Sequence, residues 1–148
     1  MPAIGPEIPR RSLLLFGVAA GVLRAAGDPA DDVWDMVTRL AGALGRGDAS
    51  DFLGLCDSKM PDYETLRTYV EALTASYDAN SGIDPVRNEG DDRARSVEMD
   101  WSLRLVDRTG LGRVTERRAN VKARLEKRGR AWKFVGLDPI SFFAPPSA

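Results

Sequence analysis

Few side chains in this sequence could take part in catalysis or bind a metal, because its 148 residues contain no histidine and a single cysteine. Without histidine there is no Ser-His-Asp or Cys-His pair, and the usual side chain for proton transfer near neutral pH is missing. Cys56 stands among Phe52, Leu53 and Leu55, so we expect a buried thiol rather than a nucleophile. No metal-ligand spacing, phosphate-binding glycine loop or nucleophile motif occurs. The sequence therefore predicts no metal site and no cofactor.

A carboxylate and a phenol are the acid-base groups that remain. Asp57 follows an apolar segment and could act as a base, with Tyr63, Tyr69 or Tyr77 as a hydrogen-bond donor. We expect Asp57 and Tyr63 at the surface or at a helix boundary, and Tyr69 and Tyr77 in the core. Asp100 lies in the middle of a predicted strand, on the face opposite the apolar residues, so it should point outward. The sequence favours a non-catalytic role.

Four aromatic residues could instead line a ligand pocket, because such pockets are mostly aromatic and aliphatic with few polar groups. These residues are Trp34, Tyr69, Trp101 and Trp132. Packing of the core alone explains them about as well. The sequence thus leaves two alternatives open, a pocket for a small hydrophobic ligand and an interior filled by its own side chains.

The N-terminal segment has the three-part layout of a secretory signal. Arg10 and Arg11 precede an apolar stretch over 13–23, LLLFGVAAGVL, which is followed by small residues. A helix of that length would span only about 16 Å, so we expect no stable membrane span. The arginine pair resembles a twin-arginine signal, and the general secretory route is equally open. We predict a signal peptide over 1–27 and an exported protein, periplasmic or extracellular.

Apolar residues at helical spacing dominate the first half of the remaining chain. They predict a helix over 31–44, with carboxylates near its start, where the helix dipole favours negative charge. Asp48 can cap a short second helix that carries the apolar residues of 52–56. A third helix is expected over 61–77, and 80–82 should end it.

The apolar period then changes from about 3.6 to two, which indicates strands. The predicted strands lie at 83–88, 97–106, 119–126 and 131–137. Pro85 confines the first of them to a sheet edge, because proline has no amide hydrogen to donate. A hairpin turn at 109–112 joins the second strand to the third.

The end of the chain is apolar. The last strand carries Trp132 and Phe134 on one side and Val135 and Leu137 on the other, so we expect both of its faces to meet protein. The segment 140–143 should pack back on the core as a lid. The predicted fold is α+β, with three N-terminal helices on one face of a curved antiparallel sheet of three to four strands.

This layout resembles the NTF2-like superfamily of cone-shaped domains, including its SnoaL-like and ketosteroid isomerase-like members. The residues that carry the resemblance are GRGDASDF at the end of the first helix (45–52), the long hairpin strands, and GRAWKF in the last strand (129–134). The resemblance covers about 31–143, and it implies one cone-shaped domain over 28–148.

The resemblance implies more than one function, because the superfamily includes isomerases, dehydratases, nuclear transport adaptors and exported domains of unassigned role. In the enzyme version, Asp57 and Tyr63 would serve an isomerase or dehydratase acting on a hydrophobic substrate. Asp57 would then have to face a cavity and have a raised pKa. We expect instead an exported, non-catalytic domain that binds a small hydrophobic ligand or a protein partner.

The charges are unevenly distributed, with 15 acidic and 5 basic residues over 28–92, and 6 acidic and 13 basic residues from 93 onward. The basic residues assigned to the sheet face are Arg117, Arg118, Lys122, Arg124, Lys127, Arg128, Arg130 and Lys133. We expect no nucleic acid there, because the signal segment argues for export and the strands lack exposed aromatic residues. A solvated face is the simplest use of these charges, and an anionic cell-envelope polymer could also bind them. The resemblance adds a homodimer through the outer sheet face.

Overall fold

The computed structural model describes residues 28–147, so the predicted signal peptide over 1–27 lies outside the described residues. The chain divides into two units, with the boundary after Asp32. The described part of the first unit is Asp28–Asp32, which holds the first turn of helix α1 with its two carboxylates. The second unit contains the rest of the fold. No helix within 28–147 is long and apolar enough to cross a membrane.

Three α-helices come first in the described chain, as predicted. They are α1 (Pro29–Gly45), α2 (Ala49–Gly54) and α3 (Tyr63–Ser76). The apolar side chains of α1 from Val33 onward and those of α3 recur at helical spacing and are buried. Asp48 caps α2 as expected, since its side chain accepts a hydrogen bond from the backbone N–H of Asp51 at 2.8 Å.

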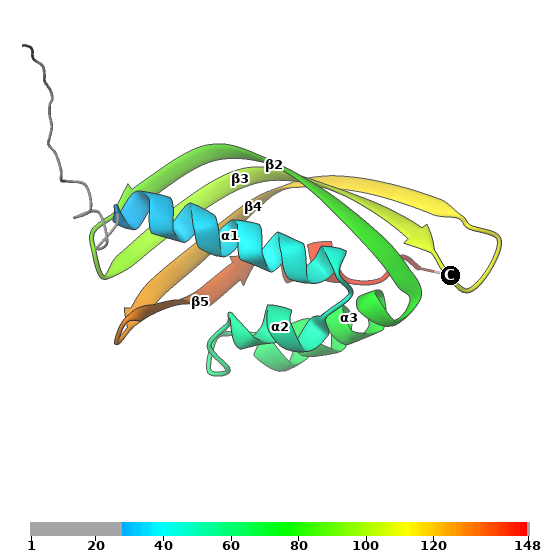
Figure 1. The fold of residues 1–148 in the computed structure, drawn as a ribbon, viewed down its shortest axis with the longest axis horizontal. Helices are drawn as coiled ribbons and strands as arrows, with labels where there is room; N and C mark the ends of the chain where they lie inside the picture. Colours follow the sequence, from blue (N-terminus) through cyan, green and yellow to red (C-terminus); the bar gives the residue numbers. More distant parts are fainter. Residues whose placement is uncertain (1–27, 148) are drawn as a thin grey trace, which may run out of the picture. The chain divides into compact units, whose positions relative to one another are not determined.

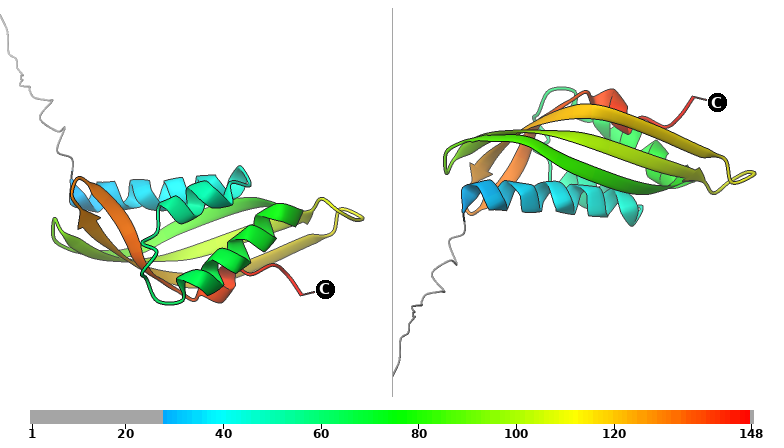
Figure 2. Two further views of the ribbon diagram at one scale, coloured as in Figure 1. Left: turned by 90° about the horizontal axis from the view of Figure 1, so that it is seen from below. Right: turned by 90° about the horizontal axis from the view of Figure 1, so that it is seen from above.

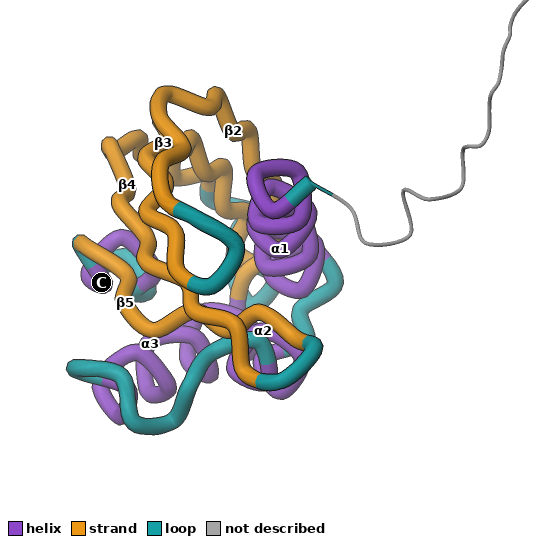
Figure 3. The backbone as a smooth tube through the Cα atoms, turned by 90° about the vertical axis from the view of Figure 1, so that its left-hand side faces the viewer, coloured by secondary structure: helices purple, strands orange, loops and turns teal. Residues whose placement is uncertain are grey.

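Four strands follow and form one antiparallel sheet in the order β2-β3-β4-β5. The strands are β2 (Tyr77–Gly90), β3 (Ala94–Asp107), β4 (Val114–Arg128) and β5 (Ala131–Asp138). The sheet is curved, and α1, α2 and α3 all lie on its concave side (Figure 1). The two views in Figure 2 and the end-on view in Figure 3 show the same arrangement. The expected α+β architecture is confirmed.

Strand β2 is longer than predicted. It begins directly after α3 and includes 80–82, which we expected to be a break. The segment pairs with β3 along its length, so the hydrogen-bond ladder outweighs the low strand preference of Asn, Ser and Gly. Gly82 suits this place, because a Cβ there would meet the Ser102 hydroxyl at 2.7 Å. The predicted edge position of Pro85 is confirmed, and the register shifts between Pro85 and Arg87.

Contrary to our expectation, strand β5 does not place Leu137 on the side opposite Trp132 and Phe134. Phe134 pairs with Leu125 of β4, but the next pair joins Gly136 to Arg124, so Val135 is the extra residue of a β-bulge. The bulge reverses the alternation, and Leu137 therefore lies on the same inner face as Phe134. Both side chains are buried.

The predicted lid is the short 3-10 helix η2 (Ile140–Phe143), which brings two aromatic rings into the core. The ring of Phe143 lies 5.2 Å from that of Trp101 and 5.5 Å from that of Phe52, measured between centroids. Phe142 lies 5.9 Å from Trp101. These rings join the inner face of the sheet to α2, and we call Phe52, Trp101, Phe142 and Phe143 the ring cluster.

Phe143→Ala should lower the free energy of unfolding by about 3 to 5 kcal/mol, because it removes a fully buried ring from the ring cluster. Denaturant unfolding followed by circular dichroism measures this change. Leu111→Ala is the control, since Leu111 is 99% exposed and should change stability by no more than about 0.5 kcal/mol. Equal unfolding midpoints for the two variants would show that η2 does not hold the core together.

Candidate functional site

The four predicted ligand-binding aromatics do not converge on an open pocket. Trp101 and Trp132 are 0% and 6% exposed, and Trp34 packs against the core from α1. Tyr69 is half-buried and is not among the residues packed on the core, contrary to our expectation. Residues 28–147 form hollows of about 570, 410 and 420 Å³, and none of the four aromatics lines any of them.

The interior beside Trp101 is occupied by the chain's own rings. Phe142 and Phe143 both contact the Trp101 ring in tilted or edge-on geometry. The indole N–H groups of Trp101 and Trp132 are buried without an acceptor in the described part of the chain. Such a donor costs about 1 to 3 kcal/mol, and a ligand oxygen could satisfy it. At Trp101, a ligand would first have to displace part of the ring cluster.

Asp57 does not meet the requirement of a general base. Its carboxylate accepts a hydrogen bond from the backbone N–H of Lys59 at 2.8 Å and pairs with Arg128 at 3.1 Å. These interactions hold the pKa of Asp57 below its usual value. If Asp57 were the general base of an isomerase or dehydratase, its pKa would have to be raised. Tyr63 is the first residue of α3, and no hydrogen bond joins it to Asp57 in the described structure. The two residues form no acid-base pair here.

Cys56 is buried as predicted, and the lack of solvent around it raises the pKa of its thiol to about 12. A thiol with this pKa carries almost no thiolate at neutral pH, so it is not a nucleophile. Asp100 lies on the outer face as predicted, where its carboxylate accepts from Asn120 at 3.3 Å. Within 28–147, no three Cys, Asp or Glu residues gather where they could hold a metal ion.

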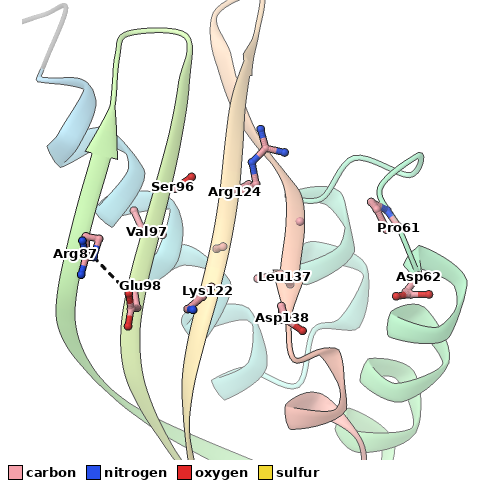
Figure 4. Close-up of a pocket in the computed structure, with 12 residues that line it drawn as sticks. Pro61, Asp62, Arg87, Ser96, Val97, Glu98, Lys122, Arg124, Leu137 and Asp138 are labelled. Carbon is pink, nitrogen blue, oxygen red and sulfur yellow. Dashed lines mark ion pairs between the residues drawn. The ribbon is translucent and has the colours of Figure 1, made fainter.

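The hollow of about 570 Å³ opens on the sheet, away from the residues of the ring cluster. All four strands contribute charged residues to its lining (Figure 4). They are Arg87 of β2, Glu98 of β3, Lys122 and Arg124 of β4, and Asp138 of β5. These side chains lie on the outer face, since they alternate with the buried residues of their strands. The loop before α3 borders the hollow through Pro61 and Asp62.

Four of these charges lie in register across the sheet, and we call Arg87, Glu98, Lys122 and Asp138 the charge row. Arg87 is the strand partner of Glu98, Glu98 that of Lys122, and Lys122 that of Asp138. The signs therefore alternate from β2 to β5. The guanidinium of Arg87 lies 3.5 Å from the Glu98 carboxylate, and the Asn120 amide donates to Glu98 at 3.0 Å. The row crosses the face that we expected to be merely solvated.

The sequence analysis placed Arg117 on the wrong face of the sheet. We assigned it to the outer face, but it pairs with Leu103 and alternates with Ala119 and Val121 on the inner side. Its Nη1 donates to the backbone carbonyls of Phe142 and Ala144, at 2.8 and 2.6 Å. The alternation of β4 could have revealed this position, because it places Arg117 in the same row as the apolar residues Ala119, Val121 and Leu125.

The sequence matches no protein-family model, and no curated protein sequence matches it. Solved structures do match. An NTF2-like superfamily protein from Salmonella enterica has a TM-score of 0.62 at 11% identity, over 81% of this chain and 93% of that one. A ketosteroid isomerase-like protein from Erwinia carotovora has a TM-score of 0.62 at 10% identity, over 75% of this chain and 94% of that one. A conserved protein from Planctomyces limnophilus has a TM-score of 0.63 at 11% identity, over 70% of this chain and 88% of that one.

These likenesses show that the chain has an NTF2-like fold. At such low identity they show the fold alone, since proteins that share a fold often differ in function. The function has to be inferred from the residues of this chain.

The ion pair of Asp57 with Arg128 should make the free energy of unfolding depend on pH in the acidic range. Because the folded-state pKa of Asp57 is lowered, its contribution is complete above the unfolded-state pKa and is lost as pH falls through the folded-state value. The stability difference between the native chain and Asp57→Asn should therefore be constant above about pH 5 and shrink below about pH 4. Unfolding at a series of pH values measures it.

Asp84→Asn serves as the control, since that carboxylate is 81% exposed and lies 3.9 Å from Arg118. Its effect on stability should be small at every pH. Carboxyl NMR that showed Asp57 titrating above pH 5 would contradict the ion-pair interpretation and support a role as a base.

Proposed function

We propose that this chain is an exported, non-catalytic domain of NTF2-like fold that acts through a protein partner bound to the outer face of its sheet, and that a second copy of the chain is this partner. Three observations support the proposal. The ring cluster occupies the interior beside Trp101, Asp57 has the wrong pKa for a base, and the charge row crosses a hollow on the outer face.

The charge row carries the proposal because it is complementary to itself. In a twofold dimer the same patch of each copy faces the other, so each residue must match the one that it meets. Rotation about an axis parallel to the strands, between β3 and β4, reverses the order of the strands. Arg87 then faces Asp138 of the second copy, and Glu98 faces Lys122. All four charges meet the opposite sign.

Other positions on the outer face fit the same rotation. Arg104 of β3 is the strand partner of Glu116 of β4, and Asp100 is that of Asn120. In the dimer, Arg104 would face Glu116 of the second copy, and Asp100 would face Asn120 of the second copy. Arg104 and Glu116 lie 3.6 Å apart within the chain, and the Asn120 amide already donates to Asp100. The dimer would repeat these pairings between copies.

The size of the face is sufficient for a stable contact. Three strands of 14 or 15 residues together with the eight residues of β5 offer roughly 700 to 800 Å². A standard interface buries about 800 Å² on each partner. Exposed ion pairs contribute little each, but desolvated pairs at an interface fix its register and disfavour other partners. The charge row would therefore set the geometry of the dimer more than its strength.

Reversing the charges in the row tests the dimer. Glu98→Lys places an ammonium opposite the Lys122 ammonium of the other copy, and the twofold axis repeats this repulsion, so the dimer should dissociate. Lys122→Glu should act in the same way through two carboxylate repulsions. The double variant restores opposite signs and should dimerise again. Sedimentation velocity at several salt concentrations measures the association, which should weaken as salt rises.

Glu71→Lys makes the same charge change on α3, where the side chain is 55% exposed, and should leave the dimer intact. A native chain that sediments as a monomer, or a double variant that stays dissociated, would rule out this pairing.

Export rests on the segment over 1–27. When the full chain is produced in a bacterium, the mature protein should begin between Ala26 and Asp31, because the small residues of 25–30 suit a signal peptidase. Mass spectrometry of the periplasmic and culture fractions measures the new N-terminus. Arg10→Lys with Arg11→Lys should abolish export by the twin-arginine route and spare the general route. An intact N-terminus in the cell extract alone would contradict export.

A further inference from the structure

Arg117 is a cation on the inner, largely apolar face of the sheet. It belongs to β4, two residues before Ala119, and it is half-buried near the point where η2 ends. Loss of solvent lowers the pKa of its guanidinium, and the nearby Tyr77 phenol raises it by a smaller amount. A charge in this position needs a partner.

The partners of Arg117 are neutral. Its Nη1 donates to the carbonyls of Phe142 and Ala144, and no carboxylate lies within 4 Å in the described structure. Arg128, by contrast, pairs with both Asp57 and Glu126 while far more exposed. A guanidinium has five N–H donors, so the Nε and Nη2 groups of Arg117 are free for an acceptor.

Arg117 also lines the hollow of about 420 Å³. Residues from β4 and from the segment after β5 form its walls, and within that lining Arg117 is the one charged residue. Ala119, Pro139 and Pro145 supply apolar surface, and Ser141 supplies a hydroxyl. A single cation beside apolar walls suits a monoanion with an apolar body better than a dianion such as phosphate.

We infer that this hollow binds a carboxylate that carries a small apolar body. The two oxygens of the carboxylate would accept hydrogen bonds from Nε and Nη2 of Arg117, in the parallel two-bond geometry that guanidinium favours. The apolar body would lie against Ala119 and the prolines. The carboxylate can belong to a small organic acid or to the C-terminus of a peptide. This inference is independent of the proposed dimer, because Arg117 and the charge row lie on opposite faces.

Titration of the native chain with phenylacetate tests the inference. The ¹⁵N-labelled Nε–H resonance of Arg117 and the backbone amide of Ala119 should shift until saturated. Phenylacetamide has the same apolar body without the charge and should bind at least about tenfold more weakly, because charge-assisted hydrogen bonds are worth roughly twice neutral ones. Equal binding of the two probes, or no saturable shift with phenylacetate, would overturn the inference.

Two substitutions of Arg117 test whether its positive charge binds the carboxylate. Arg117→Met should weaken phenylacetate binding about tenfold to a hundredfold, and Arg117→Lys should weaken it less because the charge remains. Arg118→Met is the matched control, since Arg118 is the next residue, points to the outer face and pairs with Asp84. An equal loss in Arg118→Met would show that binding depends on net charge alone, against the inference.

Two further measurements keep the test decisive. If Arg117→Met unfolds, Arg117→Lys and the native-chain titration still distinguish the outcomes. A tetrapeptide with a free C-terminal carboxylate, compared with its amide, then separates the two sources of the ligand. Tighter binding of the free peptide than of phenylacetate identifies a peptide C-terminus, and the reverse order identifies a small acid. Repeating the titration with Glu98→Lys separates a failure of this site from a failure of the dimer.

Discussion

The packing of Phe142 and Phe143 against Trp101 is the contact on which the rest of the structure depends. These rings come from η2 and from the middle of β3, and Phe52 of α2 completes the contact. Elements from the start, middle and end of the domain therefore meet in one cluster of buried aromatic surface. Such rings bury large apolar areas and prefer the edge-on geometries seen here. Since the chain fills its own interior at this point, its binding surfaces have to be sought elsewhere.

The alternation of side chains along β3, β4 and β5 separates an apolar inner face from a charged outer face. The β-bulge at Val135 preserves this separation, because without it Leu137 would turn outward. Arg117 is an exception on the inner face, and the backbone carbonyls of Phe142 and Ala144 partly accommodate it. The same lid that closes the core thus also brings an arginine and a set of prolines together.

Solved structures of similar fold include a ketosteroid isomerase-like protein and a protein of unknown function, so the fold does not choose between catalysis and binding. The proposed function rests on where three carboxylates of this chain lie. Asp57 is paired with Arg128, and Glu98 and Asp138 lie on the outer face in register with cations. The pKa of Asp57 is lowered by these contacts, whereas a general base would need a raised pKa. The alternating signs of the charge row are the basis of the proposed pairing between two copies.

The sequence by itself determined the three helices, the long hairpin, the edge position of Pro85, the lid and the burial of Cys56, because periodicity and local composition control such features. It did not determine where β2 begins, the bulge at Val135 or the role of Arg117. The first two depend on how neighbouring strands pair, and the contacts of Arg117 depend on where the segment after β5 returns. Whether the aromatic residues would line a pocket or fill it was equally undecided from composition. Only the tertiary structure settled it beside Trp101, because that outcome depends on where η2 returns.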